Sequence, residues 1–283
     1  MKWSLKIIIV LTIGIQSAGA QIIPKVPADL QKYFAEMQSI KNAHITERYE
    51  WKYILHDGNV TNTRYCTRII KYDEIGRMSE SIALDQKGQK MSILIFSYDK
   101  HNMPETETEY LPTGEILGRT VYDYTPGQYL QNITWYHGTE YIIDKTVFET
   151  DEQSQTLTER HLYSPDSVDS KVIYYYSDLQ DGWVEKERMF SGEDGLEYEK
   201  EIIRNDNRKI ESEEWLNGAG THIYSLKYHY NSEGNLVLQD KLFATGQRIK
   251  VADFNYSPAS LLTGEINYNA QGEISRYRKF SYK

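Results

Sequence analysis

Carboxylates are the most numerous side chains that could take part in catalysis in this sequence of 283 residues. Glu105, Glu107 and Glu109 alternate along one stretch, and Glu185 and Glu187 do so further on. Two carboxyl groups at ~5 Å or ~6.5–9.5 Å serve retaining or inverting glycosidases, respectively. No such distance follows from the sequence, and alternating Glu residues also mark the solvated face of a strand. We favour the solvated face and predict no catalytic residues.

Other reactive or metal-binding patterns are missing from the sequence. No two of the seven His lie at i, i+4 around a Glu, and neither a G-x-S-x-G elbow nor a P-loop occurs. Two acidic turns, Ser177–Gly182 and Ser191–Gly195, offer oxygens, but neither matches a calcium loop with its roughly six to eight ligands. The single Cys, Cys66, lies in an apolar alternating run, which favours an inert thiol and excludes an internal disulfide. We expect no metal, no cofactor and no enzymatic activity.

Aromatic side chains are the strongest indication of a function. The sequence has 24 Tyr and five Trp. In a sheet whose strands end in Tyr, aromatic residues form rows, and cross-strand packing accounts for most of them. A row that is exposed along a groove can instead bind a glycan, a peptide or a lipid. The residues that we expect on such an aromatic binding surface are Trp51, Trp135, Trp183, Trp215, Tyr224 and Tyr228.

The aromatic residues recur at a regular interval. From residue 43 onward, 17 aromatic or large apolar residues, eleven of them Tyr, each precede a polar turn, at intervals of 12 to 15 residues. Twelve of the 16 Gly beyond residue 20 lie two to five residues after one of them, where tight hairpin turns need positive φ. In turns such as Asp73–Gly76 and Asn269–Gly272, the first side chain can bond the backbone two residues on. The interval therefore indicates one strand and one turn.

Two intervals make a hairpin unit of 26 residues, as from Tyr72 to Tyr98, and such self-similarity indicates a repeat array. We predict an all-β fold, a long antiparallel meander of tandem β-hairpin repeats with about 18 strands. Because twisted open sheets rarely exceed ~10 strands without curling, we expect a curled open sheet or half-barrel. One short helix, with Leu30, Tyr33 and Met37 at helical spacing, is expected to cap the open edge of the first strand. Charges on the last strand, Arg276, Arg278 and Lys279 among them, would protect the other edge.

Several turns resemble known hairpin repeats. Tyr72–Gly76 is similar to the YD repeat of RHS-type proteins, and Tyr110–Ile116, Trp215–Gly218 and Tyr268–Ile274 resemble MORN-type (YwqK-like) repeats. The resemblance covers about 240 residues, and small secreted repeat proteins of Bacteroidota are similar in size. It implies a β-hairpin array and no particular chemistry. RHS proteins use such arrays as shells around a toxic cargo, but this chain is far shorter and has no candidate toxin segment after the repeats.

The first 20 residues indicate export. Lys2 and Lys6 flank the apolar run Ile7–Ile15, and Ala18-Gly19-Ala20 is a small-x-small cleavage site. The run is shorter than the ~20 apolar residues of a membrane-spanning helix, although an uncleaved anchor is the alternative. The residue directly after the cleavage site is Gln21 and not Cys, so we do not expect a lipoprotein. We predict a signal peptide at 1–20, an N-terminal segment with the helix at 21–42 and a β-hairpin repeat domain at 43–283, in a periplasmic, secreted or cell-surface protein.

Charge restricts the partners of the exported chain. The sequence has 32 basic and 41 acidic residues, and loss of Lys2 and Lys6 would change the net charge from −9 to −11. An acidic protein is poorly suited to nucleic acid or to an anionic membrane surface, so we expect neither partner. The leading hypothesis is an exported, non-enzymatic protein that binds a protein or glycan partner. The alternatives are a carrier that holds a lipid or lipoprotein against a concave sheet face, and a glycan-acting hydrolase; the oligomeric state is open.

Overall fold

The computed structural model describes residues 25–283 except 139, 165–166 and 181. Within these residues, one helix precedes eighteen strands, each antiparallel to its neighbours. The helix is α1 (Pro27–Asn42), and the strands are β1 (Glu47–His56), β2 (Asn59–Tyr72), β3 (Met78–Leu84), β4 (Lys90–Tyr98), β5 (Pro104–Tyr110), β6 (Ile116–Tyr124), β7 (Leu130–His137), β8 (Tyr141–Asp151), β9 (Thr156–Ser164), β10 (Ser167–Tyr176), β11 (Val184–Ser191), β12 (Gly195–Arg204), β13 (Ile210–Asn217), β14 (His222–Tyr230), β15 (Leu236–Phe243), β16 (Arg248–Tyr256), β17 (Leu262–Tyr268) and β18 (Ile274–Tyr282). The signal peptide predicted at 1–20 lies outside the described residues.

One type of five-residue turn joins most of the strands. In the turn between β2 and β3, the backbone N–H of Asp73 donates to the carbonyl of Arg77 (2.8 Å), and Gly76 donates to the carbonyl of Asp73 (3.0 Å). The Asp73 carboxylate accepts bonds from the backbone N–H groups of Ile75 and Arg77. Eleven turns in total, this one included, have this backbone pattern among the described residues, and the fourth residue of each has a positive φ. The interval of Tyr and Gly residues in the sequence therefore does mark strand ends and turns.

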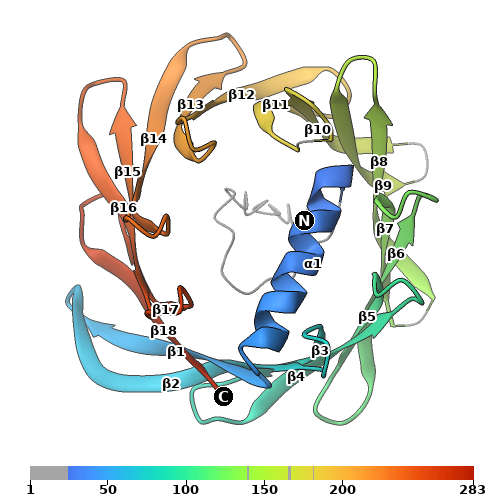
Figure 1. Ribbon diagram of the computed structural model, residues 1–283, viewed down its shortest axis with the longest axis vertical. Coiled ribbons are helices and arrows are strands. Elements are labelled where there is room, and N and C mark those ends of the chain that lie inside the picture. Colours follow the sequence, from blue (N-terminus) through green and yellow to red (C-terminus); the bar gives the residue numbers. More distant parts are fainter. Residues whose placement is uncertain (1–24, 139, 165–166, 181) are drawn as a thin grey trace, which may run out of the picture.

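The sheet closes into a barrel, which Figure 1 shows end-on. β1 pairs with β18 as well as with β2, so each strand has two hydrogen-bonded neighbours. Beside this pairing, Thr46 N–H donates to the carbonyl of Lys283 (2.7 Å), and Lys283 N–H donates to the carbonyl of Glu47 (3.0 Å). The prediction of an open curled sheet or half-barrel is therefore wrong, although the all-β hairpin meander is confirmed. An open sheet leaves a row of unpaired backbone groups at each edge, and closure removes both rows.

The features expected to protect open edges have other roles. α1 lies inside the ring of strands and not along a strand edge (Figure 1). On β18, Arg276 and Arg278 form ion pairs with Glu265 of β17, at 3.4 and 2.5 Å. The ammonium group of Lys279 lies 5.4 Å from the ring centre of Tyr53 on β1, across the closing pair of strands. The charged side chains of β18 therefore contact the neighbouring strands of a closed sheet and do not protect an open edge.

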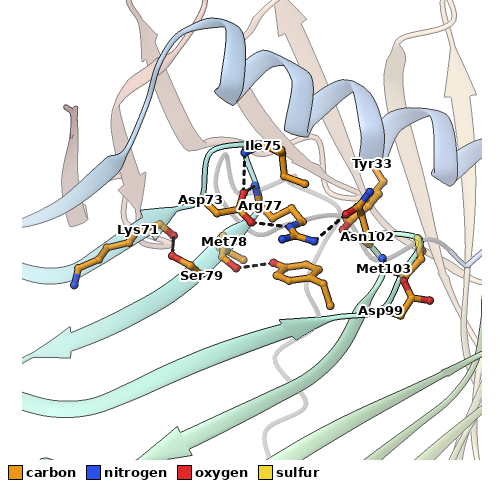
Figure 2. A network of polar contacts seen from close by, with 11 residues as sticks. Tyr33, Lys71, Asp73, Ile75, Arg77, Met78, Ser79, Asp99, Asn102 and Met103 are labelled. Carbon is orange, nitrogen blue, oxygen red and sulfur yellow. Dashed lines mark hydrogen bonds and ion pairs between the residues drawn. The ribbon is translucent and has the colours of Figure 1, made fainter.

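α1 sits against one rim of the barrel, here called the helix rim, which is formed by the turns after the even-numbered strands. Tyr33 and Met37 of the helix pack with Met103 in a buried cluster. The Tyr33 hydroxyl donates to the carbonyl of Asn102 (2.5 Å) in the turn after β4. Figure 2 shows this seat beneath the helix, in which the Arg77 guanidinium links the two adjacent turns by bonds to Asp73 and to Asn102 (2.7 and 2.9 Å).

The turn after β2 approaches the backbone of the helix closely at Gly76. Its φ is +90°, and a Cβ atom added there would lie 2.2 Å from the carbonyl oxygen of Met37. Gly88, in the equivalent turn after β3 on the opposite rim, has a φ of +79° and nothing within 4 Å of an added Cβ. Only a residue without a side chain fits between the turn after β2 and the helix.

We expect Gly76→Ala to destabilise the protein by about 1–3 kcal/mol more than Gly88→Ala, measured by urea unfolding. Both substitutions carry the ~1–2 kcal/mol cost of a left-handed alanine, but only Gly76→Ala also overpacks the helix seat. Equal losses for the two variants would show that α1 does not rest on this turn.

Candidate functional site

The contacts of the N-terminal segment identify the inner face of the barrel. Lys25 forms an ion pair with Glu159 of β9 (2.7 Å), and Val26, which is fully buried, packs in a cluster with Phe148 and Leu157. Residues directly opposite each other on antiparallel strands share a face. The pairing register therefore carries the inner face from strand to strand. It runs through a row here called the inner row: Tyr174, Glu187, Lys200, Trp215 and Tyr224, on β10 to β14.

The inner row holds an ion pair and aromatic rings in direct contact. The ammonium group of Lys200 lies 2.6 Å from the Glu187 carboxylate and 5.3 Å from the ring centre of Trp215. Trp215 in turn stacks on Tyr224 with ring centres 5.4 Å apart. Glu187, Lys200 and Trp215 are all buried. Glu187 is thus buried in an ion pair, and the expectation of a solvated face is wrong for this residue.

The structure separates the six aromatic residues of the predicted binding surface into distinct places. Trp215, Tyr224 and Tyr228 lie on the inner wall, where Trp215 and Tyr228 are only 4% and 7% exposed. Trp135 faces inward from β7, opposite Asp144, and is 46% exposed. Trp51, on β1, donates from its indole to the Ser281 hydroxyl (3.0 Å) on the outer face. Trp183 follows β10 in a turn at the helix rim.

An open groove of about 940 Å³ contains Trp183, and it is called the rim groove below. Its volume lies within the ~300–1,000 Å³ of ligand sites in general. Tyr175, Arg188 and Ile203 each follow an inward-facing residue along their strand, so they point outward, and the groove lies on the outer face at the helix rim. The lining residues are Tyr175, Ser177, Asp178, Trp183, Glu185, Lys186, Arg188, Glu201, Ile202, Ile203, Arg204 and Arg208.

Guanidinium groups cover both aromatic rings of the rim groove. The Arg204 and Arg208 guanidinium carbons lie 4.8 and 5.9 Å from the centre of the Trp183 ring. Arg188 lies 5.5 Å from the ring centre of Tyr175 and donates to its hydroxyl (3.4 Å). Contacts of a cation with an aromatic face contribute ~0.5–1 kcal/mol at exposed sites. The two rings therefore help to position the three arginines.

The carboxylate beside the rim groove is held in its ionised form. Glu199 forms ion pairs with Arg188 (2.5 Å) and with Lys186 (3.0 Å). Burial acts to raise the pKa of Glu199, but the two cations outweigh it and the pKa is lowered. A general acid needs a pKa near the working pH. The arrangement suits binding of a ligand better than proton transfer.

The other residues with reactive side chains lie away from the rim groove. Glu107 faces inward, where it accepts a bond from the Tyr122 hydroxyl (2.6 Å) and burial raises its pKa. Cys66 is half-buried on β2, and burial raises the pKa of its thiol, as expected of an inert cysteine. In the described part of the chain, no group of three or more His, Cys, Asp and Glu is arranged to hold a metal ion. No helix in that part has the length and apolar character needed to span a membrane.

The sequence interpretation included Trp183 in a binding surface but missed Tyr175, Arg188, Arg204 and Arg208. One signal could have found Arg208: it lies 25 residues after Trp183, almost one hairpin unit of 26. Neighbouring turns of the helix rim make contact at this spacing elsewhere. The bonds from Arg77 to Asn102 and from Lys209 to Gly234 each join residues 25 apart.

Comparison with known proteins gives no family assignment. No protein-family profile matches the sequence, and no curated protein matches it. Among solved structures, the Photorhabdus luminescens Tc holotoxin pore matches 77% of this chain and 12% of its own, at 15% identity and a TM-score of 0.37. Porin-like proteins from Bacteroides uniformis and Bacteroides vulgatus each match 84% of this chain and 96% and 98% of their own, at 8% and 9% identity and TM-scores of 0.34 and 0.36. Likeness of this degree is confined to general β-architecture, so the resemblance to YD-type and MORN-type repeats stays a prediction.

Glu159 anchors the segment that precedes α1 to the barrel wall. Its carboxylate accepts bonds from Lys25 (2.7 Å) and the Tyr174 hydroxyl (3.1 Å), and His161 lies 3.3 Å away. Burial acts to raise the pKa of Glu159, but Lys25 and His161 outweigh it and lower the pKa to about 2. The same contact with Glu159 raises the pKa of His161.

We expect Glu159→Gln to cost about 1.5–3 kcal/mol of unfolding free energy near pH 5.5, the range for a hydrogen bond to a charged group. The lowered pKa of Glu159 stabilises the fold above its ordinary value of 4.5, and this stabilisation is lost as the pH falls toward 2. The raised pKa of His161 stabilises the fold below its ordinary value of 6.5, and this part is lost as the pH rises above it. The difference between wild type and variant should therefore be largest between these two values.

Urea unfolding as a function of pH measures this difference. Glu149→Gln is the matched control, because Glu149 pairs with Arg160 on the neighbouring strands but is 61% exposed, and exposed pairs contribute only ~0–1 kcal/mol. A difference between wild type and Glu159→Gln that does not change with pH would contradict the assigned role of the carboxylate.

Proposed function

We propose that this protein is an exported β-barrel that is surrounded by water, not by lipid, and that it binds a glycan or protein partner at the rim groove. The observation that carries the proposal is the rim groove, an open cleft in which aromatic rings and guanidinium groups converge from two adjacent turns and three strands. Arginine and aromatic residues are the side chains most enriched at binding hot spots. The binding function, the compartment and the partner are all part of this proposal.

The outer face of the barrel supports placement in water. Ion pairs join neighbouring strands on this face, as between Lys227 and Glu214 (3.1 Å), and Arg248 pairs with Asp240. Lys and Arg on a lipid-facing barrel wall cost ~2–4 kcal/mol each at the bilayer midplane. A barrel wall that carries several such pairs is therefore far more stable in contact with water than in contact with lipid.

The inner face supports binding of a polar partner over transport of a lipid. A lipid carrier requires a concave face lined by aliphatic side chains. Here the inner wall carries ion pairs, including Glu187 with Lys200 and Glu265 with Arg278. Removal of water from such pairs by a lipid chain would be costly. The rim groove, which already presents aromatic and charged groups to solvent, is the better candidate.

We expect the protein to bind at least one member of an array of neutral and acidic oligosaccharides, and Trp183→Ala to weaken that binding by about tenfold or more, since aromatic hot spots contribute ~2 kcal/mol or more. Trp51→Ala, on the outer face of the opposite wall, is the matched control and should bind like wild type. Affinities would be measured by biolayer interferometry on variants with unchanged circular dichroism. Absence of binding to any oligosaccharide would contradict a glycan partner, and wild-type affinity in Trp183→Ala would contradict the location.

A further inference from the structure

Lys241 on β15 projects into the lumen of the barrel without a carboxylate partner. It pairs with Leu226 of β14, which follows Tyr224 of the inner row by two residues, so all three side chains share the inner face. Among the described residues, no Asp or Glu forms an ion pair with Lys241, and its ammonium group donates no hydrogen bond. All three N–H donors of this half-buried cation therefore remain for water or a ligand.

Two other cations on this part of the inner wall are neutralised by carboxylates. The Lys200 ammonium group lies 2.6 Å from the Glu187 carboxylate, and the Arg278 guanidinium lies 2.5 Å from the Glu265 carboxylate. Lys241 has no such neighbour in the described part of the chain, and burial lowers the pKa of its ammonium group. An anionic ligand would supply the carboxylate that this position lacks.

Apolar groups surround the ammonium group of Lys241. It lies 3.5 Å from the ring centre of Tyr224 and 5.0 Å from that of Phe243, the residue that pairs with Tyr224. The residues paired with Lys241 on the two neighbouring strands are Leu226 and Ile249. Both rings are half-buried, so each keeps some exposed surface. The position therefore offers one positive charge within an aromatic and aliphatic surface.

The apolar surface around Lys241 is narrow and lies near the rim opposite the helix. β15 ends two residues after Lys241, and Figure 1 shows β14 to β16 across the ring from α1. A barrel of ~16–18 strands is too wide to be filled by its own side chains, which leaves a small molecule a route to Lys241 from this rim. On β13, Glu213 pairs with Leu226 and limits the apolar surface to β14–β16, a width of ~10 Å at ~4.8 Å between strands. A body of one or two fused rings fits this width.

We infer that this part of the lumen is a binding site for a small aromatic acid, in which Lys241 binds the carboxylate while Tyr224 and Phe243 contact the ring. An ammonium group and a carboxylate form a short, charge-assisted hydrogen bond, and aromatic rings pack edge to face or offset. A long-chain lipid would not fit, because Glu213 interrupts the apolar surface. The lumen site is separate from the rim groove, which lies on the outer face at the helix rim, and it does not depend on the function proposed for the groove.

The test compares 2-naphthoate with 2-naphthamide, which has the same two fused rings and nearly the same shape but no charge. Affinities would be measured by isothermal titration calorimetry on the purified protein. We expect naphthoate to bind about tenfold or more tightly than naphthamide, as for loss of a charge-assisted hydrogen bond. The affinity for naphthoate alone should fall with added NaCl.

Substitutions of Lys241 assign the difference to its charge. Lys241→Met keeps an unbranched, flexible side chain against both rings, so the protein should fold, as urea unfolding would verify, and bind naphthoate no more tightly than naphthamide. Lys241→Arg keeps the charge and should keep the preference. Lys279→Met is the matched control, because the Lys279 ammonium group lies 5.4 and 5.8 Å from the ring centres of Tyr53 and Tyr277, but on the outer face.

A preference for naphthoate that disappears in Lys241→Met and persists in Lys279→Met would support the lumen site. Equal affinity of the wild type for the two ligands, or binding of neither, would overturn it. A preference that persists in Lys241→Met would overturn it as well, because the carboxylate would then bind at another cation.

Discussion

The pairing of β1 with β18 is the constraint on which the rest of the structure depends. It joins residues more than 220 positions apart, such as Trp51 with Lys279, and completes a ring of eighteen strands. Closed barrels of ~16–18 strands are too wide to be filled by their own side chains. The lumen therefore has room for α1 and for Lys25 and Val26 before it, and the inner wall is lined by ion pairs and stacked rings. Closure also gives every turn a fixed neighbour on its rim, and the rim groove lies between two such turns.

The two rims of the barrel differ although their turns share one geometry. On the rim opposite the helix, the fourth residue of each five-residue turn is Gly, and an added Cβ would meet nothing within 4 Å at Gly88, Gly114, Gly220, Gly246 or Gly272. On the helix rim, that position is Asn102, Gln128, Arg208 or Ser260 in four of six turns. A side chain at positive φ costs ~1–3 kcal/mol. The side chain of Asn102 accepts a bond from Arg77 (2.9 Å) and Arg208 lines the groove, so at both positions the strained residue makes a contact that glycine could not.

The sequence was sufficient to predict the strands but not their closure. The interval of Tyr and Gly reflects local chemistry, because each turn is stabilised within its own five residues. The Tyr preference also has a local reason: the hydroxyls of Tyr98, Tyr230 and Tyr282 each donate to a backbone carbonyl 20 residues earlier, at the start of the preceding strand. Closure depends instead on the accumulated twist and stagger of all the strands. The sequence of a single repeat does not indicate these totals. The charged residues of β18 are compatible both with an exposed edge strand and with a strand inside a sheet. Only their structural partner, Glu265 on the neighbouring strand, distinguishes the two.

The candidate site was predictable only in part, because its residues come from different repeats. Trp183 was recognised by its type, whereas the importance of Arg204 and Arg208 depends on what surrounds them. Composition cannot show that Arg204 and Arg208 both lie over the ring of Trp183. Yet a repeat of 26 residues places equivalent positions of successive hairpins next to each other on one rim. Contacts between residues 25 apart, as from Asn235 to Ser260, follow from that geometry. In a hairpin-repeat barrel, a search for aromatic and cationic residues one repeat apart would therefore find rim sites that a search for local motifs overlooks.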